Sequence, residues 1–124
     1  DKTIYETMGA MCESWGEKTE NHYGYSRVGA VVGATYPQQL EEMRQKMPHT
    51  FFLVPGYGAQ GGGAKDVAGA FDKNGLGAVV NSSRAILTAW KKAGTDGKDF
   101  AQQARAAAIT MREDIMGVVG KISL

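Results

Sequence analysis

Three short apolar segments, each followed by a segment with helical periodicity, constrain the fold of this chain more than any other feature. They comprise residues 28–33, 51–54 and 78–80. Their apolar residues do not alternate with polar ones, which is typical of parallel strands covered on both faces. Strands that alternate with helices indicate a parallel α/β fold. We therefore predict a three-stranded parallel sheet with both faces covered.

The segments around the predicted strands carry helix signals. Near the amino terminus, Thr3 and Glu6 fit a capping box, and apolar residues continue at helical spacing to Trp15. Pro37 suits the first position of a second helix, and Pro48 ends that helix. Further helices are predicted over residues 64–71, near 85–92 and from about 100 to 118. The predicted order is one helix followed by three strand–helix units.

The length of the chain conflicts with a closed version of this fold. Three parallel strands leave two sheet edges unpaired, and a (β/α)8 barrel needs about 250 residues, whereas the chain has 124. It also begins with a predicted helix and not with the strand that such a helix should follow. We therefore expect the chain to be a piece of a larger domain.

Composition and charge exclude several functional classes. Apolar residues make up 43% of the chain, but no apolar run approaches the ~18 residues of a membrane span. A net charge of +1 without a basic stripe argues against nucleic-acid binding. The single cysteine, Cys12, and the lack of a secretory leader favour a cytoplasmic protein. Neither His22 nor His49 has metal-ligand spacing, so no metal site is predicted.

A glycine-rich loop follows the second predicted strand. Five glycines within residues 56–63 would let backbone N–H groups approach an anion. Arg84, just after the third strand, would bring a permanent cation to the same rim, because ligands bind at the carboxyl ends of parallel strands. We predict a phosphate site between these loops. The alternative is a flexible connector beside a surface arginine.

Residues 56–61 also match the G-x-G-x-x-G pattern of dinucleotide-binding proteins. That pattern requires the helix to open within the glycines and an acidic residue about twenty positions later. Here two further glycines precede the helix, and residues 76–81 contain no carboxylate. A dinucleotide site is therefore disfavoured.

Three motifs together resemble a known enzyme family. The string PGYGAQGG at 55–62, preceded by VVGATYP at 31–37 and followed by NSSRAI at 81–86, resembles the carboxyl-terminal half of orotidine 5′-phosphate decarboxylase, especially its longer bacterial subgroup. The resemblance implies a partial (β/α)8 TIM barrel containing strands 6–8 and a preceding helix. Residues 1–124 would then be the carboxyl-terminal part of one barrel domain whose amino-terminal half is absent.

The resemblance also implies an activity and a set of binding residues. The family is a lyase of pyrimidine biosynthesis that decarboxylates orotidine monophosphate to uridine monophosphate (UMP) without metal or organic cofactor. Gln60 matches the glutamine that bridges pyrimidine and phosphate, Arg84 matches the arginine that grips the phosphate, and Ser83 stands where a backbone N–H is used. Tyr57 occupies a loop position at the border of the pyrimidine pocket. The predicted substrate-binding residues are Gln60, Arg84, Ser83, Tyr57, Gly61 and Gly62.

The lysine and aspartate network on which this family's chemistry depends has no match in the chain. Asp1 and Lys2 head a predicted helix and do not end a strand. No catalytic residue is therefore assigned, and the chain alone is expected to be inactive.

The exposed edges of a three-strand piece predict partners. We expect the chain to pair with the missing half of the barrel and to self-associate as a homodimer or a larger assembly. Two other functions stay open on the residues alone: another phosphosugar barrel enzyme, such as an epimerase or a synthase, and a phosphate-binding module without chemistry.

Overall fold

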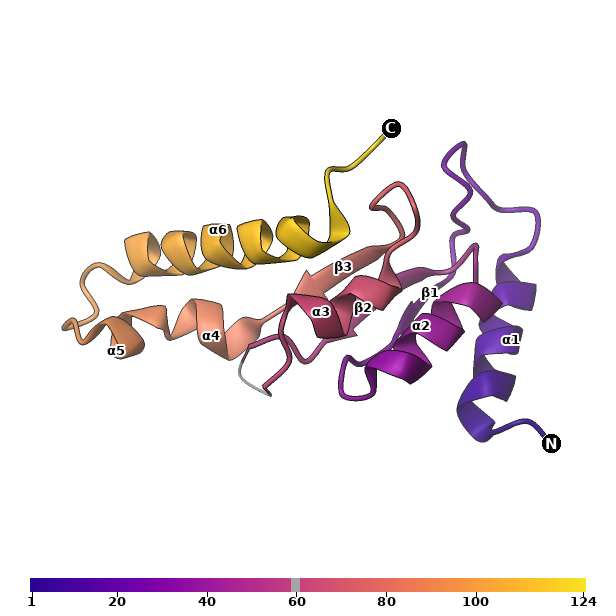
Figure 1. Ribbon diagram of the computed structural model, residues 1–124, viewed down its shortest axis with the longest axis horizontal. Coiled ribbons are helices and arrows are strands. Elements are labelled where there is room, and N and C mark those ends of the chain that lie inside the picture. The colour runs from indigo at the N-terminus through magenta and orange to yellow at the C-terminus, as the bar shows by residue number, and fades with distance from the viewer. Residues whose placement is uncertain (59–60) are drawn as a thin grey trace.

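The chain folds around a three-stranded parallel sheet in the order β1-β2-β3 (Figure 1). The computed structural model describes residues 1–58 and 61–124. The helices are α1 (Ile4–Gly16), α2 (Pro37–Lys46), α3 (Ala64–Val67, continued by a 3-10 turn over Ala68–Ala70), α4 (Ser83–Leu87), α5 (Ala89–Ala93) and α6 (Phe100–Val119). The strands are β1 (Gly29–Val31), β2 (Phe51–Pro55) and β3 (Ala78–Asn81). The predicted parallel α/β architecture is confirmed.

Local signals place most elements where the sequence predicted them. The capping box of α1 is present: the backbone N–H of Thr3 donates to Glu6 Oε2 at 2.8 Å, and the N–H of Glu6 donates to Thr3 Oγ1 at 3.4 Å. Pro37 occupies the first turn of α2. The single helix predicted near residues 85–92 is instead two short helices that meet at Thr88, whose N–H and hydroxyl both donate to the Arg84 carbonyl, at 2.9 and 2.6 Å.

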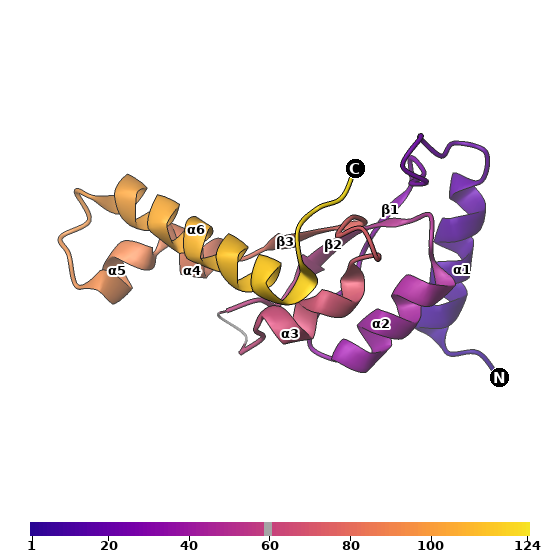
Figure 2. The same cartoon turned by 45° about the horizontal axis from the view of Figure 1, so that its top comes forward.

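Helices α2 and α3 cover one face of the sheet (Figures 1 and 2). The side chains of Phe52 and Val54 on this face are fully buried. They pack in one cluster with apolar residues of the helices, including Leu40, Met43 and Val67. Alternate residues of the central strand β2 therefore point into a closed core, which is the usual period of two for a strand.

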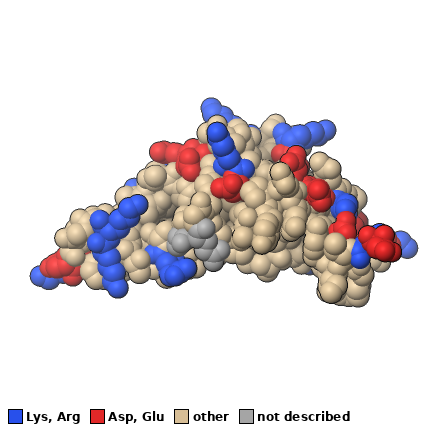
Figure 3. All heavy atoms as spheres, turned by 60° about the horizontal axis from the view of Figure 1, so that its bottom comes forward, with Lys and Arg blue, Asp and Glu red and all other residues tan. Residues whose placement is uncertain are grey.

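The opposite face of the sheet is bare, so the prediction of cover on both faces is wrong. The side chains on this face are apolar, yet Val31 is 69% exposed, Val79 is 51% exposed, and Phe51 and Leu53 are each 40% exposed. Figure 3 shows a molecule that is hollowed along one margin, where most atoms belong to uncharged residues. A continuous apolar run indicates that both faces of a strand are apolar. It does not indicate which element, if any, covers each face.

A buried arginine ties together the residues that lead into β2 and β3. Arg44, on α2, is 7% exposed. Its Nη1 donates to the carbonyl oxygens of Gly77 at 3.0 Å and Ala70 at 3.4 Å. Its Nη2 donates to the carbonyl of Thr50 at 2.7 Å and to that of Met47. One guanidinium therefore satisfies four main-chain acceptors that have little access to water.

Aromatic and acidic residues complete the surroundings of this guanidinium. Its Cζ lies 4.1 Å from the centroid of the Phe52 ring and 5.6 Å from that of the Tyr25 ring. The Tyr25 hydroxyl donates to Asp72 Oδ2 at 2.6 Å. Burial, followed by this hydrogen bond to Asp72, raises the pKa of Tyr25 to about 12, so the phenol is a donor at neutral pH. Burial lowers the pKa of Arg44 below its usual value.

Two possible features are not found in the described part of the chain. Over residues 1–58 and 61–124, no helix has the length and apolar character needed to cross a membrane. The same residues contain no group of three or more His, Cys, Asp or Glu side chains arranged to hold a metal ion.

The Arg44 contacts predict a large effect of its removal. Arg44→Met keeps an apolar stem but leaves buried carbonyl oxygens without donors, so the free energy of unfolding in urea should fall by about 2–4 kcal/mol. Lys46→Met is the matched control, because Lys46 lies on the same helix and pairs with Glu6 at the surface. Its cost should stay below about 1 kcal/mol. An Arg44→Met protein as stable as the control would show that the carbonyl groups find other donors.

Candidate anion-binding site

The loops that follow the three strands begin side by side at the carboxyl edge of the sheet. Pro55 at the end of β2 is in register with Asn81 at the end of β3. The backbone N–H of Ala34, after β1, donates to the Pro55 carbonyl at 3.0 Å. The glycine-rich loop therefore leaves the sheet between the other two loops, and it lies at the same end of the strands as the Arg84 loop, as the sequence predicted.

A serine fastens the glycine-rich loop to the loop that carries Arg84. Ser82 is 7% exposed, and its hydroxyl donates to the carbonyl oxygen of Tyr57 at 2.9 Å. Helix α4 starts at the next residue, Ser83. Ser83 and Arg84 are therefore the two residues that come after this contact in the chain. Ser82 is not among the residues predicted from the sequence, although its position immediately before a helix is one that favours serine.

The described glycines of the loop form hydrogen bonds within the loop backbone. The N–H of Gly58 donates to the Gly62 carbonyl at 2.7 Å, and the N–H of Gly61 donates to the Gly58 carbonyl at 2.8 Å. A Cβ atom at Gly62 would lie 2.5 Å from the carbonyl oxygen of Gly56, closer than side chains tolerate. The N–H of Gly63 is occupied by Asp66 Oδ2 at 2.7 Å and is not free for a ligand.

Arg84 lies on the rim of a small cavity between the two loops. The cavity has a volume of about 190 Å³ and is lined by Pro55, Gly56, Tyr57, Asn81, Ser82, Ser83 and Arg84. Among the described residues, no carboxylate forms an ion pair with Arg84. Pockets for whole small molecules usually measure about 300–1,000 Å³, so this cavity is large enough for only part of such a ligand.

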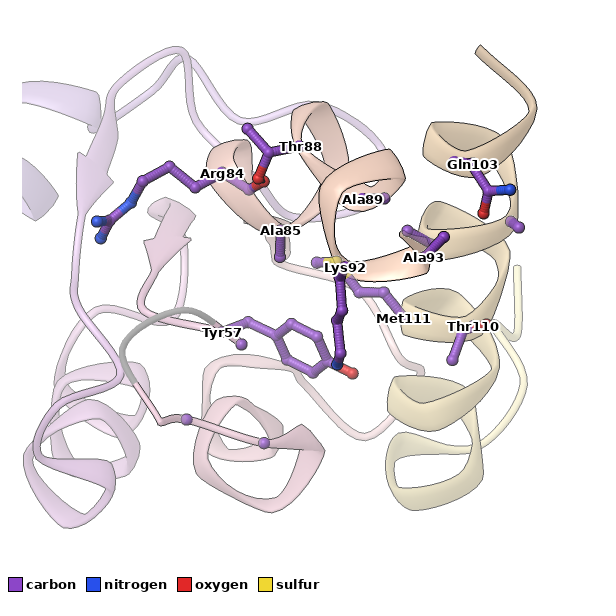
Figure 4. Close-up of a pocket in the computed structure, with 15 residues that line it drawn as sticks. Tyr57, Arg84, Ala85, Thr88, Ala89, Lys92, Ala93, Gln103, Thr110 and Met111 are labelled. Atoms are coloured by element: carbon purple, nitrogen blue, oxygen red, sulfur yellow. The ribbon is translucent and has the colours of Figure 1, made fainter. Parts of the chain in front are cut away.

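The Tyr57 side chain is directed toward helix α6. Its hydroxyl donates to Asp114 Oδ2 at 2.7 Å. Burial, followed by this hydrogen bond, raises the pKa of Tyr57 to about 12, so its hydroxyl is protonated at neutral pH. In Figure 4 the Tyr57 ring and the Arg84 guanidinium point in different directions, and both residues line a second, larger cavity of about 850 Å³ between α4, α5 and α6.

The structure brings together most of the residues predicted to bind substrate. Tyr57, Ser83 and Arg84 line the small cavity. Gly62 pairs with Tyr57 through an isolated bridge, and the N–H of Gly61 is bonded within the same loop. Gln60 lies outside the described residues. The sequence analysis missed Asp114, and no local signal pointed to it, because the residue that it contacts lies 57 positions earlier in the chain.

Comparison with known proteins adds a relationship by sequence. No family model matches the chain. Over 120 residues the chain is 48% identical to orotidine 5′-phosphate decarboxylase of Rhodopirellula baltica, an alignment that covers 94% of the chain and 40% of the relative. The chain spans about 40% of the length of the curated relatives it matches. The resemblance seen in the three motifs is thereby confirmed.

Solved structures give the same relationship. The chain superposes on a candidate orotidine-monophosphate decarboxylase from Toxoplasma gondii with a TM-score of 0.72 and 27% identity, covering 98% of the chain and 44% of that protein. It superposes on Leishmania donovani OMP decarboxylase with a TM-score of 0.69 and 29% identity, covering 96% of the chain and 40% of that protein.

Two adjacent glycines should respond differently to the same substitution. Gly62→Ala places a methyl group against the backbone at Gly56, so the loop must rearrange. Gly61→Ala meets no atom within 4 Å, and its positive φ of 83° should cost about 1–2 kcal/mol. We expect the backbone amide NMR signals of Gly58 and Gly63 to shift strongly in Gly62→Ala and weakly in Gly61→Ala. Equal shifts in the two variants would contradict the crowding at Gly62.

Proposed function

We propose that this chain is the carboxyl-terminal part of an orotidine 5′-phosphate decarboxylase and supplies the phosphate-binding side of its active site. The whole enzyme would convert orotidine monophosphate to UMP and carbon dioxide. The observation that carries this proposal is the 48% identity over 94% of the chain, a stretch that includes the glycine-rich loop and Arg84. The proposal extends to a cytoplasmic enzyme that uses no metal or organic cofactor.

The surfaces that the sheet leaves open support a place in a larger barrel. One face is helix-covered, and the other carries exposed apolar side chains, as the inner wall of an incomplete barrel would. Apolar cavities also lie along both edge strands: one of about 920 Å³ beside β1 and one of about 670 Å³ beside β3. We propose that β1, β2 and β3 are strands 6, 7 and 8 of a (β/α)8 barrel.

Charge and backbone geometry support a phosphate as the group held here. Arg84 offers a planar, permanently charged donor, and the adjacent N–H of Ser83 at the start of α4 adds a neutral one. Gly56 lines the small cavity and Gly62 lines the larger cavity beside Arg84, and neither residue adds a side chain there. By the family resemblance, Gln60 would bridge the pyrimidine and the phosphate, and Tyr57 would stand at the border of the pyrimidine pocket.

The chemistry of decarboxylation would come from the rest of the protein. Loss of carbon dioxide leaves a carbanion that must be stabilised and then protonated. The described residues that line the small cavity include one permanent cation, Arg84, and no lysine or carboxylate. This lining therefore contains no lysine that could donate the proton. This chain would contribute binding energy from the substrate's phosphate, which lies away from the reacting carboxyl group. That binding energy would lower the activation free energy of decarboxylation once the amino-terminal half of the barrel is in place.

Reassembly from two pieces tests the proposed function. The chain should show no turnover of orotidine monophosphate alone, and turnover should appear when it is coexpressed with the remaining amino-terminal part of the protein. A homodimer is the expected assembly of the completed enzyme, measured by light scattering. Turnover by the 124-residue chain alone would contradict the proposal that the catalytic groups lie in the amino-terminal part of the protein. Conversion of a sugar phosphate in preference to orotidine monophosphate would indicate a different barrel enzyme.

Substitution of Arg84 tests the phosphate contact in the reassembled enzyme. Arg84→Ala should lower kcat/KM by about one to two orders of magnitude, because charge-assisted hydrogen bonds contribute ~1.5–3 kcal/mol and 1.4 kcal/mol is tenfold. Arg84→Lys should recover only part, since an ammonium lacks the planar fork.

Two controls accompany this series. Lys91→Ala removes an exposed cation from α5 and should leave kcat/KM unchanged. Orotidine, which lacks the phosphate, should be turned over almost equally by the unsubstituted enzyme and by Arg84→Ala. Equal impairment on both substrates would mean that Arg84 supports the fold and does not hold the phosphate.

A further inference from the structure

Tyr57 is held at two points by two different parts of the chain. Its carbonyl oxygen accepts a hydrogen bond from the Ser82 hydroxyl at 2.9 Å. Its own hydroxyl donates to Asp114 Oδ2 at 2.7 Å. Ser82 lies between β3 and α4, whereas Asp114 lies in α6. One loop residue thus connects the rim of the small cavity to the long carboxyl-terminal helix.

Tyr57 is also the only described residue between positions 56 and 63 that has a side chain. Residues 56, 58, 61, 62 and 63 are all glycine. Glycine backbones have the largest conformational freedom, so a loop of this composition is held either by its own backbone hydrogen bonds or by an external contact. The side chains of Ser82 and Asp66 bond to the backbone of this loop, at Tyr57 and Gly63. The contact that a described side chain of the loop itself makes with another element is that of Tyr57 with Asp114.

We propose that Tyr57 and Asp114 are positioning residues, and that their hydrogen bond lets α6 hold the glycine-rich loop in the shape that receives the phosphate beside Arg84. This inference rests on the proposed function. It assigns Tyr57 a role through the loop backbone, in addition to any contact of its side chain with the pyrimidine. It also gives α6 a part in ligand binding, although no residue of α6 lines the small cavity.

The chemistry of the pair suits a constant tether. Tyr57 keeps its hydroxyl proton at neutral pH, so its hydroxyl remains a donor for the Asp114 side chain there. The adjacent acid Glu113 is also exposed on α6, and among the described residues its one ion pair is with Arg112, at 3.9 Å. Glu113 is therefore a matched control, because its removal takes the same charge from the same helix without touching Tyr57.

Affinity for UMP in the reassembled enzyme gives the principal test. Tyr57→Phe and Asp114→Ala should each raise the dissociation constant of UMP by about three- to tenfold, the effect of one lost hydrogen bond. Binding of uridine, which has no phosphate, should not change. Glu113→Ala should leave both affinities unchanged. The double variant should bind UMP no more weakly than either single variant, because both substitutions remove the same contact.

A purely structural role makes a different prediction. Alanine has a higher helix propensity than aspartate, so Asp114→Ala should not lower the melting temperature of the protein. If Asp114 positions the loop, UMP should therefore bind more weakly while the melting temperature of the protein does not fall. Additive losses in the double variant, equal losses for UMP and uridine, or unchanged UMP affinity would each overturn the inference.

Amide hydrogen exchange in the 124-residue chain separates failure of this inference from failure of the proposed function. The N–H groups of Gly58 and Gly61, which are bonded within the loop, should exchange faster in Tyr57→Phe and Asp114→Ala than in Glu113→Ala. If the unsubstituted enzyme binds no UMP but exchange rises as expected, the tether stands and the proposed function fails. If UMP binds and exchange does not change, the tether fails.

Discussion

The fold depends on a single buried cation that satisfies main-chain oxygens. Arg44 binds the carbonyl groups of Thr50 and Gly77, which are the residues immediately before β2 and β3. The same Gly77 carbonyl accepts the N–H of Phe52. By fixing the starting points of the two strands, this guanidinium sets the register that brings Pro55 level with Asn81 at the far end. Contacts at the amino-terminal ends of β2 and β3 thus help to position the candidate anion site at the carboxyl ends of the same strands.

The sheet has two apolar faces that differ in their surroundings. Helices bury Phe52 and Val54, whereas Leu53 and Val79 on the other face stay substantially exposed. A large exposed apolar surface in a soluble protein usually marks an interaction site. The cavities beside β1 and β3 extend this surface to both edges. These three features together support the view that the chain is one sector of a closed barrel.

Sequence reasoning identified the elements and missed the contacts between them. Strands, helices and the loop around Arg84 carry signals within a few residues, so periodicity, prolines and glycines were sufficient to find them. The partners of Arg44 lie up to 33 positions away, and Asp114 lies 57 positions from Tyr57. No local pattern encodes such distances. The prediction of a sheet covered on both faces failed because apolar composition does not identify the covering element.

The small volume between the two loops has a consequence for how the proposed barrel would stay together. About 190 Å³ admits only part of a small molecule, so under the proposed function the remainder of the nucleotide would extend beyond this cavity. A ligand that spans the junction acts as a clamp between two sectors of the wall. Its binding free energy is then added to the cohesion of the protein, and saturation at 100 times the dissociation constant would contribute about 2.7 kcal/mol.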